Sequence, residues 1–338
     1  MSIFKRIFLI FLIGGLIVLT SCKEQQPTKR TSFEYNNMIS HGVNMGNALE
    51  APVEGSWGVF IDNEYFKIIK QRGFDSVRIP IRWSAHISED DYTIDKNFME
   101  RVVHVVDKAL ENGLVTIINT HHFEELYQDP DKYGPVLVKI WEQIAEKFKN
   151  YPDKLFFEIY NEPAQQLTSD KWNKLYSEAL KVIRKTNPKR IVIIDVPNWA
   201  HYSAVRDLQL LDDENIIVSF HYYEPFNFTH QGAEWVTPQL PTGVKWEGKD
   251  WEVEQIKNHF KYVNDWAKKN NVPIFLGEFG AYSKADMDSR VKWTETVRRT
   301  AEEFGFSIAY WEFCAGFGIY DRTSRTWIEP LATAALGK

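Results

Sequence analysis

Two glutamates stand where strongly apolar runs of the chain stop. The run 154–160 leads into Asn161 and Glu162, and the run 272–277 leads into Glu278. Apolar runs of this length are typical of buried strands, and a carboxylate at the end of a buried strand is costly unless it has partners or a task. Two such carboxylates, in a chain that is 14% aromatic, predict acid/base and nucleophile chemistry on a sugar.

Six predicted strands carry chemically unusual residues at their C-terminal ends. Barrel enzymes keep their active sites at this face, so six converging strand ends predict a site where one polar residue would not. In chain order the residues are Arg78, His121, His122, Asn161, Glu162, His221, Tyr223, Glu278 and Trp311.

The body of the chain alternates strand-like and helix-like segments. Eight strands, each followed by a crossover, predict a single (β/α)8 TIM barrel. The longest gap between strands, 224–271, contains Trp235, Trp246 and Trp251, and we expect its loop to wall a cleft. The expected strands are 41–46, 75–80, 114–120, 155–161, 190–196, 215–221, 272–277 and 306–311.

Local signals mark two helix ends. Gly73 follows a helical pattern of apolar residues and suits a C-terminal cap. Ser169 is expected to cap the start of a helix with one apolar face. That face would contain Trp172, Leu175, Ala179, Leu180 and Ile183.

The N-terminus has the pattern of a targeting segment. Two basic residues precede the apolar stretch 7–19, whose length suits a signal peptide better than a spanning helix. Small residues then lead into Cys22, so residues 1–21 resemble a bacterial lipoprotein signal peptide. This resemblance implies a lipid on Cys22 and attachment to the cell envelope, at the outer membrane or cell surface. Ordinary secretion is the alternative.

Composition bounds the rest of the chain. Residues 22–35 are polar and predict a flexible tether, followed by one catalytic barrel over 36–338. The net charge of −6, with no basic block in the body, argues against nucleic acid as a partner. Two cysteines make neither a zinc site nor a disulfide framework, and Cys314 is expected to be a small buried hydrophobe. We expect a monomer without metal or cofactor.

The residues at the strand ends resemble glycoside hydrolase family five, within the larger group of retaining barrel glycosidases. The resemblance implies that Glu162 is the acid/base after strand four and Glu278 the nucleophile after strand seven. It extends over essentially the whole mature body, and the motifs at 44–58 and 228–235 look like a bacterial branch with endoglucanase and mannanase members. Further positions that match the family's site are Arg78, His121, Asn161, His221, Tyr223 and Trp311.

Retention of anomeric configuration needs carboxyl groups ~5–5.5 Å apart, one protonated and one ionised. We expect the neighbouring anion and a desolvated site to raise the pKa of Glu162. Arg78 would keep Glu278 charged, and Tyr223 would donate a hydrogen bond to it. For Arg78 taken alone, a purely structural ion pair is an equal alternative.

Other residues are assigned to the sugar. The amide of Asn161 would bind the 2-hydroxyl, and Trp311 would offer a flat face to a pyranose ring. His121 and His221 are expected to bond the carboxylates or the sugar. His221 and Tyr223 are two apart and share a strand face, whereas the adjacent His121 and His122 should point to opposite sides.

For the remaining candidates, a purely structural role is the alternative. His122 either contacts sugar or packs. Asn47, Glu50 and His230 would contact substrate, with local hydrogen bonding as the alternative. Among the 12 tryptophans, the expected sugar platforms are Trp57, Trp235 and Trp311.

The preferred hypothesis is a retaining endo-β-1,4-glycanase acting on cellulose-type β-glucan, with β-mannan or glucomannan as a further candidate substrate. A second hypothesis is a metal-dependent barrel hydrolase using His121, His122 and His221, which the lack of a His-x-His pair disfavours. A third is a glycan-binding lipoprotein that is non-catalytic or strictly mannan-specific.

Overall fold

The computed structural model describes residues 30–338, of which Thr31–Lys338 forms one compact unit. Its first helix, α1 (Ser32–Ile39), is capped by Thr31, whose side chain accepts a hydrogen bond from the backbone N–H of Glu34. The folded part therefore starts before residue 36, and the end of the predicted tether is helical. The predicted signal peptide and Cys22 lie outside the described residues.

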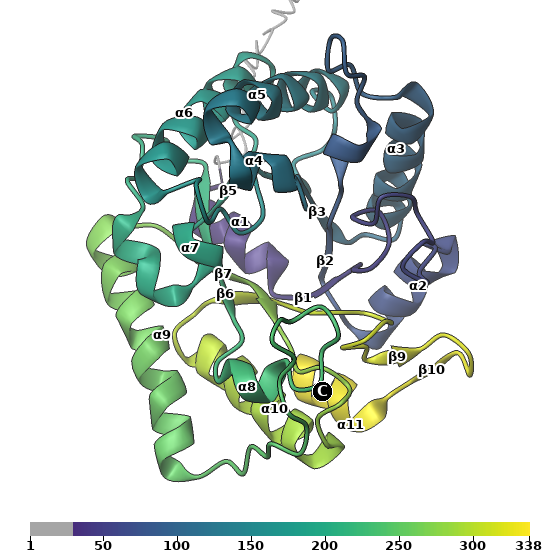
Figure 1. Cartoon of the computed structure of the whole chain (residues 1–338), viewed down its shortest axis with the longest axis vertical. Helices are drawn as coiled ribbons and strands as arrows, with labels where there is room; N and C mark the ends of the chain where they lie inside the picture. Colours follow the sequence, from purple (N-terminus) through teal and green to yellow (C-terminus); the bar gives the residue numbers. More distant parts are fainter. Residues whose placement is uncertain (1–29) are drawn as a thin grey trace, which may run out of the picture. The chain divides into compact units, whose positions relative to one another are not determined.

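Eight parallel strands close into a barrel in chain order, as predicted. Strand β1 pairs with both β2 and β8, which closes the ring seen near the centre of Figure 1. The strands are β1 (His41–Asn44), β2 (Ser76–Ile79), β3 (Val115–Asn119), β4 (Leu155–Glu158), β5 (Val192–Asp195), β6 (Ile216–Tyr222), β7 (Ile274–Phe279) and β8 (Ser307–Tyr310).

Helices follow the strands and surround the barrel, so the chain has the predicted (β/α)8 architecture (Figure 1). A short hairpin of β9 (Tyr320–Asp321) and β10 (Thr326–Trp327) lies between β8 and the last helix. The helices are α2 (Asn63–Arg72), α3 (Lys96–Glu111), α4 (Glu124–Gln128), α5 (Pro130–Lys147), α6 (Ser169–Thr186), α7 (Pro197–Ala200), α8 (Phe226–Thr229), α9 (Asp250–Asn270), α10 (Met287–Glu303) and α11 (Glu329–Leu336), with 3-10 turns η1 (Trp83–His86) and η2 (Tyr202–Asp207).

The two predicted helix ends have different outcomes. Gly73 caps α2 in the left-handed conformation, at φ 110°, and its N–H bonds the carbonyls of Ile69 and Lys70. The cap of α6 is Thr168 and not Ser169, because Thr168 is the last residue with extended backbone angles. The predicted apolar face of α6 is buried throughout.

Among the strand boundaries that differ from the prediction, two bear on the site. Strand β4 ends at Glu158, so Asn161 and Glu162 lie in the segment that follows it. Strand β7 continues to Phe279, so Glu278 lies within it. The apolar run misplaced the end of β4 because residues 159–160 stay buried after the strand has ended.

The N-terminal end of the barrel is closed by α1. Ile39 packs with strand residues such as Ile117, Phe156 and Ile193 in a small cluster inside the barrel. The amide of Asn36 donates to the carbonyl of Ile274 and accepts from the hydroxyl of Ser307, at the starts of β7 and β8. Through the described residues, no helix combines the length and apolar character needed to span a membrane.

Candidate active site

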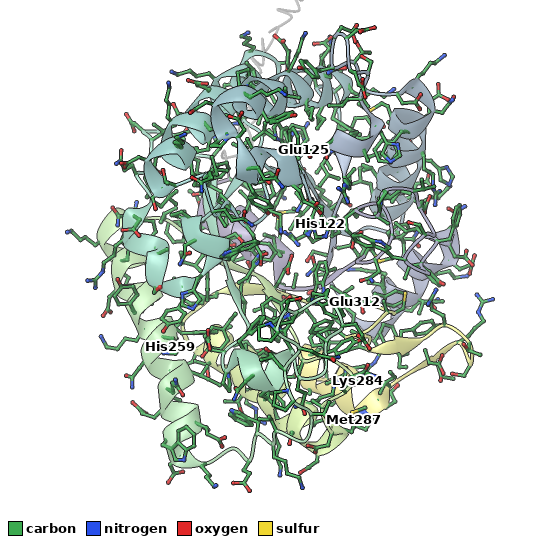
Figure 2. The ribbon with its side chains drawn as sticks, viewed as in Figure 1. His122, Glu125, His259, Lys284, Met287 and Glu312 are labelled. Carbon is green, nitrogen blue, oxygen red and sulfur yellow. The ribbon has the colours of Figure 1, made fainter. Side chains whose placement is uncertain are left out.

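A cleft of about 1190 Å³ opens at the C-terminal ends of the strands. It gathers almost every residue singled out from the sequence, although they come from six different strands or the loops that follow them. In Figure 2, His122 and Glu312 lie over the middle of the molecule, whereas His259 lies out on α9. The cleft is lined by Asn47, Glu50, Trp57, His121, His122, Asn161, Glu162, His221, Tyr223, His230, Trp235, Glu278 and Trp311.

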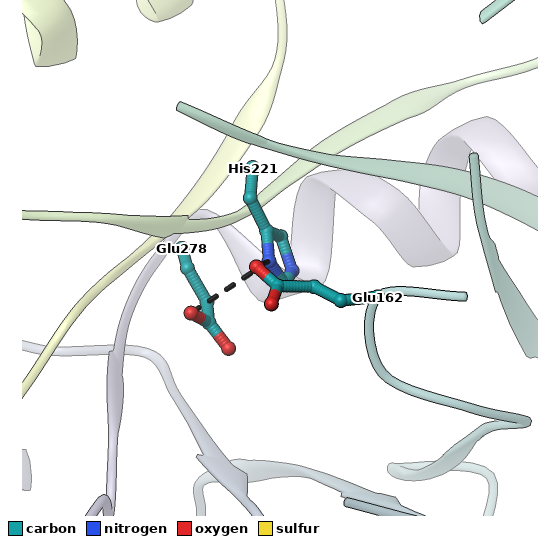
Figure 3. A group of neighbouring side chains, drawn as sticks. All are labelled: Glu162, His221 and Glu278. Carbon is teal, nitrogen blue, oxygen red and sulfur yellow. Dashed lines mark hydrogen bonds and ion pairs between the residues drawn. The ribbon is translucent and has the colours of Figure 1, made fainter. Parts of the chain in front are cut away.

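Glu162 and Glu278 face each other across His221 (Figure 3). One side-chain oxygen of each glutamate and one ring nitrogen of His221 all lie within 4.8 Å of one another. Nδ1 of His221 is 2.7 Å from Oε1 of Glu162 and 3.6 Å from Oε2 of Glu278. The two carboxyl groups are therefore close enough to act on the same bound molecule.

Arg78 is fully buried beneath the cleft and explains how Glu278 is held. Its guanidinium donates from Nη1 to Glu278 at 2.7 Å, and from Nε and Nη2 to both oxygens of Glu158 at 2.7 and 2.6 Å. Further bonds reach the side-chain oxygens of Asn44 and Asn161, so all its N–H groups are used. Arg78 is thus both a structural ion pair and a contact of the candidate nucleophile.

The two glutamates have different electrostatic surroundings. Burial raises the pKa of Glu162 to about 7, and Glu158 adds to this rise while Arg78 opposes it. The anion that adds to the rise in the pKa of Glu162 is therefore Glu158. Burial also raises the pKa of Glu278, but His221, Arg78 and the hydroxyl of Tyr223 at 2.9 Å all favour its charged form.

Burial favours the neutral form of three histidines that line the cleft. Burial lowers the pKa of His221 to about 4 and that of His122 to about 4, and it places the pKa of His121 well below its usual value. His121 and His122 both line the cleft, with ring centroids 4.5 Å apart. The expectation that they point to opposite sides is wrong, because β3 ends at Asn119 and His122 has φ 50°.

Trp311 is held as a flat wall of the cleft. Its ring stacks on His121 with an angle of 12° between the planes. A Cβ atom on Gly46 would lie 3.1 Å from the Trp311 ring, so this position favours glycine. Asn161 presents its side-chain oxygen to Arg78, which leaves Nδ2 as the end of the amide that can face a ligand.

The loop candidates reach the cleft but also make local contacts. Glu50 accepts hydrogen bonds from the backbone N–H groups of Asn47 and Ala48, and burial raises its pKa to about 8. His230 packs against the rings of Tyr223 and Phe226. Glu50 and His230 therefore line the cleft while making local contacts, and their contact with substrate stays a prediction.

Of the tryptophans predicted to lie near the cleft, some line it and others do not. Trp57 lines the cleft with its ring against that of His122, and Trp235, whose side chain is 58% exposed, also lines it. The segment expected to wall the cleft does so only in part, since Trp246 is buried and Trp251 lies on α9 away from the lining.

Sequence reasoning missed three buried polar residues beneath the site. Glu158 pairs with Arg78 and accepts from Nδ2 of Asn119 at 3.0 Å, and Asp195 accepts from the backbone N–H of Glu162 at 3.0 Å. Each interrupts or ends an apolar strand, and that signal was available.

Within residues 30–338, the group with the spacing of a metal site is Glu162, His221 and Glu278. His121 and His122 do not belong to it, which contradicts the ligand set of the metal-hydrolase hypothesis. An oxygen of Glu278 already accepts from the Arg78 cation at 2.7 Å, so a second cation there would be repelled. The donor set suits acid/base chemistry better than metal binding.

The fold and the paired carboxylates define a barrel glycoside hydrolase. Residues 37–316 match the Cellulase family, glycosyl hydrolase family 5, and the chain belongs to this family. The fold and the family resemblance predicted from the sequence are confirmed.

Known relatives agree with this assignment. A hyperthermophilic endo-β-1,4-glucanase crystallised with substrate is 79% identical, with a TM-score of 0.91 over 91% of this chain and 100% of that one. Thermotoga maritima Cel5A, crystallised with mannotriose, is 48% identical, with a TM-score of 0.88 over 90% of this chain and 99% of that one. Endoglucanase H of Acetivibrio thermocellus is 40% identical over 89% of this chain, which spans only 33% of that longer protein.

Proposed function

We propose that the protein is a retaining endo-β-1,4-glucanase that works by double displacement. The observation that carries the proposal is the close pair of Glu162 and Glu278, of which only Glu278 contacts the Arg78 cation. The family and the endoglucanase relatives support the substrate class. The endo mode of cleavage is supported by the endoglucanase relatives.

In the first step, ionised Glu278 attacks the anomeric carbon while Glu162 gives its proton to the departing glycosidic oxygen. In the second step, Glu162 takes a proton from water, which displaces Glu278 from the sugar. The pKa of Glu162, about 7, suits both roles near neutral pH. Arg78 donates a hydrogen bond to one oxygen of Glu278, and Tyr223 donates one to the other. Together these bonds orient the carboxylate toward the sugar.

Three neighbours would hold the sugar. Nδ2 of Asn161 is available to the 2-hydroxyl, since Arg78 fixes its oxygen. Trp311 offers its ring face, supported from behind by His121. Hydrogen bonds to the 2-hydroxyl strengthen in the transition state of such reactions, so Asn161 would contribute to rate as well as binding.

The test replaces each carboxyl group by its isosteric amide. Glu278→Gln should lower turnover of β-glucan by roughly 10³-fold or more, because the nucleophile is lost. Glu162→Gln should lower it by roughly 10²–10⁴-fold, but spare aryl glycosides whose leaving group needs no proton. Glu125→Gln, on the exposed side of α4, is the control.

The stereochemical outcome separates the retaining mechanism from the alternative. Proton NMR during the first minutes should show the β-anomer of the new reducing end. Initial release of the α-anomer would mean inversion, and would remove Glu278 as nucleophile. Glycan binding without new reducing ends in the native protein would favour the non-catalytic hypothesis.

We also propose that β-mannan and glucomannan are substrates. The mannotriose complex of the Thermotoga maritima relative supports this, and Glu50 and His230 line the cleft where the sugar 2-hydroxyl could be distinguished. Reducing-end release from carboxymethylcellulose, glucomannan, galactomannan and xylan should be compared side by side. Activity on a single polymer would mean that these loop residues discriminate.

Finally, we propose that Cys22 carries lipid and anchors a monomeric enzyme to the bacterial envelope, at the outer membrane or cell surface. The support is the residue pattern before Cys22. Mass spectrometry of the N-terminal peptide from membranes should find acyl groups on Cys22. Cys22→Ser should abolish the modification, whereas Cys314→Ser, at the buried thiol, should not.

A further inference from the structure

The wall of the cleft carries one permanently charged cation, Arg322. Among the described residues that line the cleft it is the one arginine or lysine. Arg78 lies beneath the wall and gives its N–H groups to other residues. Negative charge on a substrate is disfavoured over most of the cleft, because four carboxyl groups line it. These belong to Glu50, Glu162, Glu224 and Glu278.

Two backbone carbonyls hold the guanidinium of Arg322 in place. The residue directly follows β9 and begins the turn of the β9–β10 hairpin. Its Nε donates to the carbonyl of Cys314 at 3.0 Å, and its Nη1 donates to the carbonyl of Gly58. The guanidinium is therefore fixed between the segment that follows β8 and the segment that follows β1.

These two contacts leave the charge of Arg322 available to a ligand. A guanidinium offers five N–H donors, and both of its acceptors here are uncharged carbonyls. Asp321 is next in the chain, but its oxygens accept from the N–H of Thr323 and the hydroxyl of Ser324. The buried carboxyl group of Glu312 is bonded by backbone N–H groups of the segment that follows it. The side chain of Arg322 is exposed, so an anion can reach it.

Arg322 lies on the side of the cleft that would hold the attacked sugar. Its carbonyl partners come directly after Trp57 and shortly after Trp311 in the chain, and both tryptophans line the cleft. Glu162 follows β4, which lies across the closed barrel from β8. Since the leaving group departs on the side of the acid, Arg322 borders the part of the chain that stays bound.

We propose that Arg322 forms a binding site for carboxylate groups carried by a β-glucan, such as uronic acid or carboxymethyl substituents. This inference rests on the proposed glucanase function and extends it to acidic substrates. A guanidinium and a carboxylate form charge-assisted hydrogen bonds, which are stronger than those to the hydroxyl groups of an unsubstituted chain. The site offsets the repulsion that a chain of net charge −6 exerts on an acidic polymer.

The test compares carboxymethylcellulose with uncharged hydroxyethylcellulose of the same degree of substitution. An exposed ion pair contributes up to ~1 kcal/mol, so Arg322→Gln should lower kcat/KM on carboxymethylcellulose about 5-fold. The loss on hydroxyethylcellulose should stay below about 2-fold, because no charge is lost from that contact. Arg325→Gln is the matched control, since it removes the same charge from the same turn at a residue outside the cleft lining.

Two further measurements separate charge from bracing of the wall. Arg322→Lys keeps the charge but not the fork of donors, so the ratio of kcat/KM on the two polymers should stay within about 2-fold of the native ratio. In roughly 1 M salt, where the Debye length is about 3 Å, the difference between Arg322→Gln and Arg325→Gln should disappear.

Equal losses on both polymers in Arg322→Gln would overturn the proposal, because Arg322 would then only brace the wall. No loss on either polymer, or the same change of ratio in Arg325→Gln, would overturn it as well. Inactivity of the native protein on both polymers would contradict the proposed function itself, so the two failures are distinguishable.

Discussion

At the scale of single residues, the site separates two chemically identical side chains by the partners each receives. Glu278 contacts the Arg78 guanidinium and the Tyr223 hydroxyl, which favour a carboxylate. Glu162 contacts the ring of His221, and the nearby carboxylate of Glu158 raises the pKa of Glu162 further. When the surroundings of two carboxyl groups give them different pKa values, that difference identifies which one is the acid and which is the nucleophile.

This difference predicts a bell-shaped dependence of kcat/KM on pH. The alkaline limb should follow Glu162, whose pKa of about 7 means that the acid loses its proton above neutrality. The acid limb should follow Glu278, at a pH above the usual glutamate value because burial raises its pKa. Initial rates on a soluble β-glucan across pH 4–9 test this, and activity that kept rising past pH 8 would contradict it.

Tyr223→Phe removes the hydroxyl that bonds Glu278 at 2.9 Å. A hydrogen bond to a charged group is worth about 1.5–3 kcal/mol, so kcat should fall roughly 10- to 100-fold. The acid limb should also move to higher pH, since Tyr223 lowers the pKa of Glu278.

Tyr222→Phe is the matched control for this change. The Tyr222 hydroxyl bonds His259 on α9, outside the cleft lining. Its loss should leave both limbs of the pH profile in place. If both variants moved the acid limb equally, the effect would come from β6 as a whole and not from the bond to Glu278.

At the scale of elements, the sequence predicted what periodicity and burial determine. All eight strands were predictable, because buried parallel strands are near-continuous apolar runs. The family resemblance was predictable from the residues at the ends of those strands. The end of β4 was misplaced, since burial outlasts strand pairing there. The paired orientation of His121 and His122 was not predictable, because it depends on the positive φ of His122 beyond β3.

The cap of α2 gives a prediction at this scale. Gly73 has φ 110°, and a Cβ atom there would meet Leu336 at an ordinary 3.6 Å, so only the backbone opposes a side chain. Gly73→Ala should destabilise the protein by about 1–2 kcal/mol. Gly73→Asn should cost less, since asparagine tolerates left-handed angles. Urea unfolding midpoints measure both, and equal losses would mean that packing, not conformation, sets the cost.

At the scale of the whole molecule, the two ends of the barrel have separate tasks. The C-terminal ends of the strands carry the cleft, and the N-terminal ends are closed by α1. Because the two ends are separate, loops at the cleft end can change without disturbing the packing of α1 at the other end.

The division predicts that the seal can be weakened without loss of catalysis. Ile39→Ala removes a fully buried side chain from the cluster that closes the barrel, and should destabilise the protein by about 2–5 kcal/mol. Phe33→Ala, at a side chain 44% exposed on the same helix, should change stability little. Below the unfolding temperature, kcat and KM on β-glucan should match the native values for both variants. If kcat fell in proportion to stability in Ile39→Ala, the two ends would be coupled through the strands, and α1 would belong to the catalytic machinery as well as to the fold.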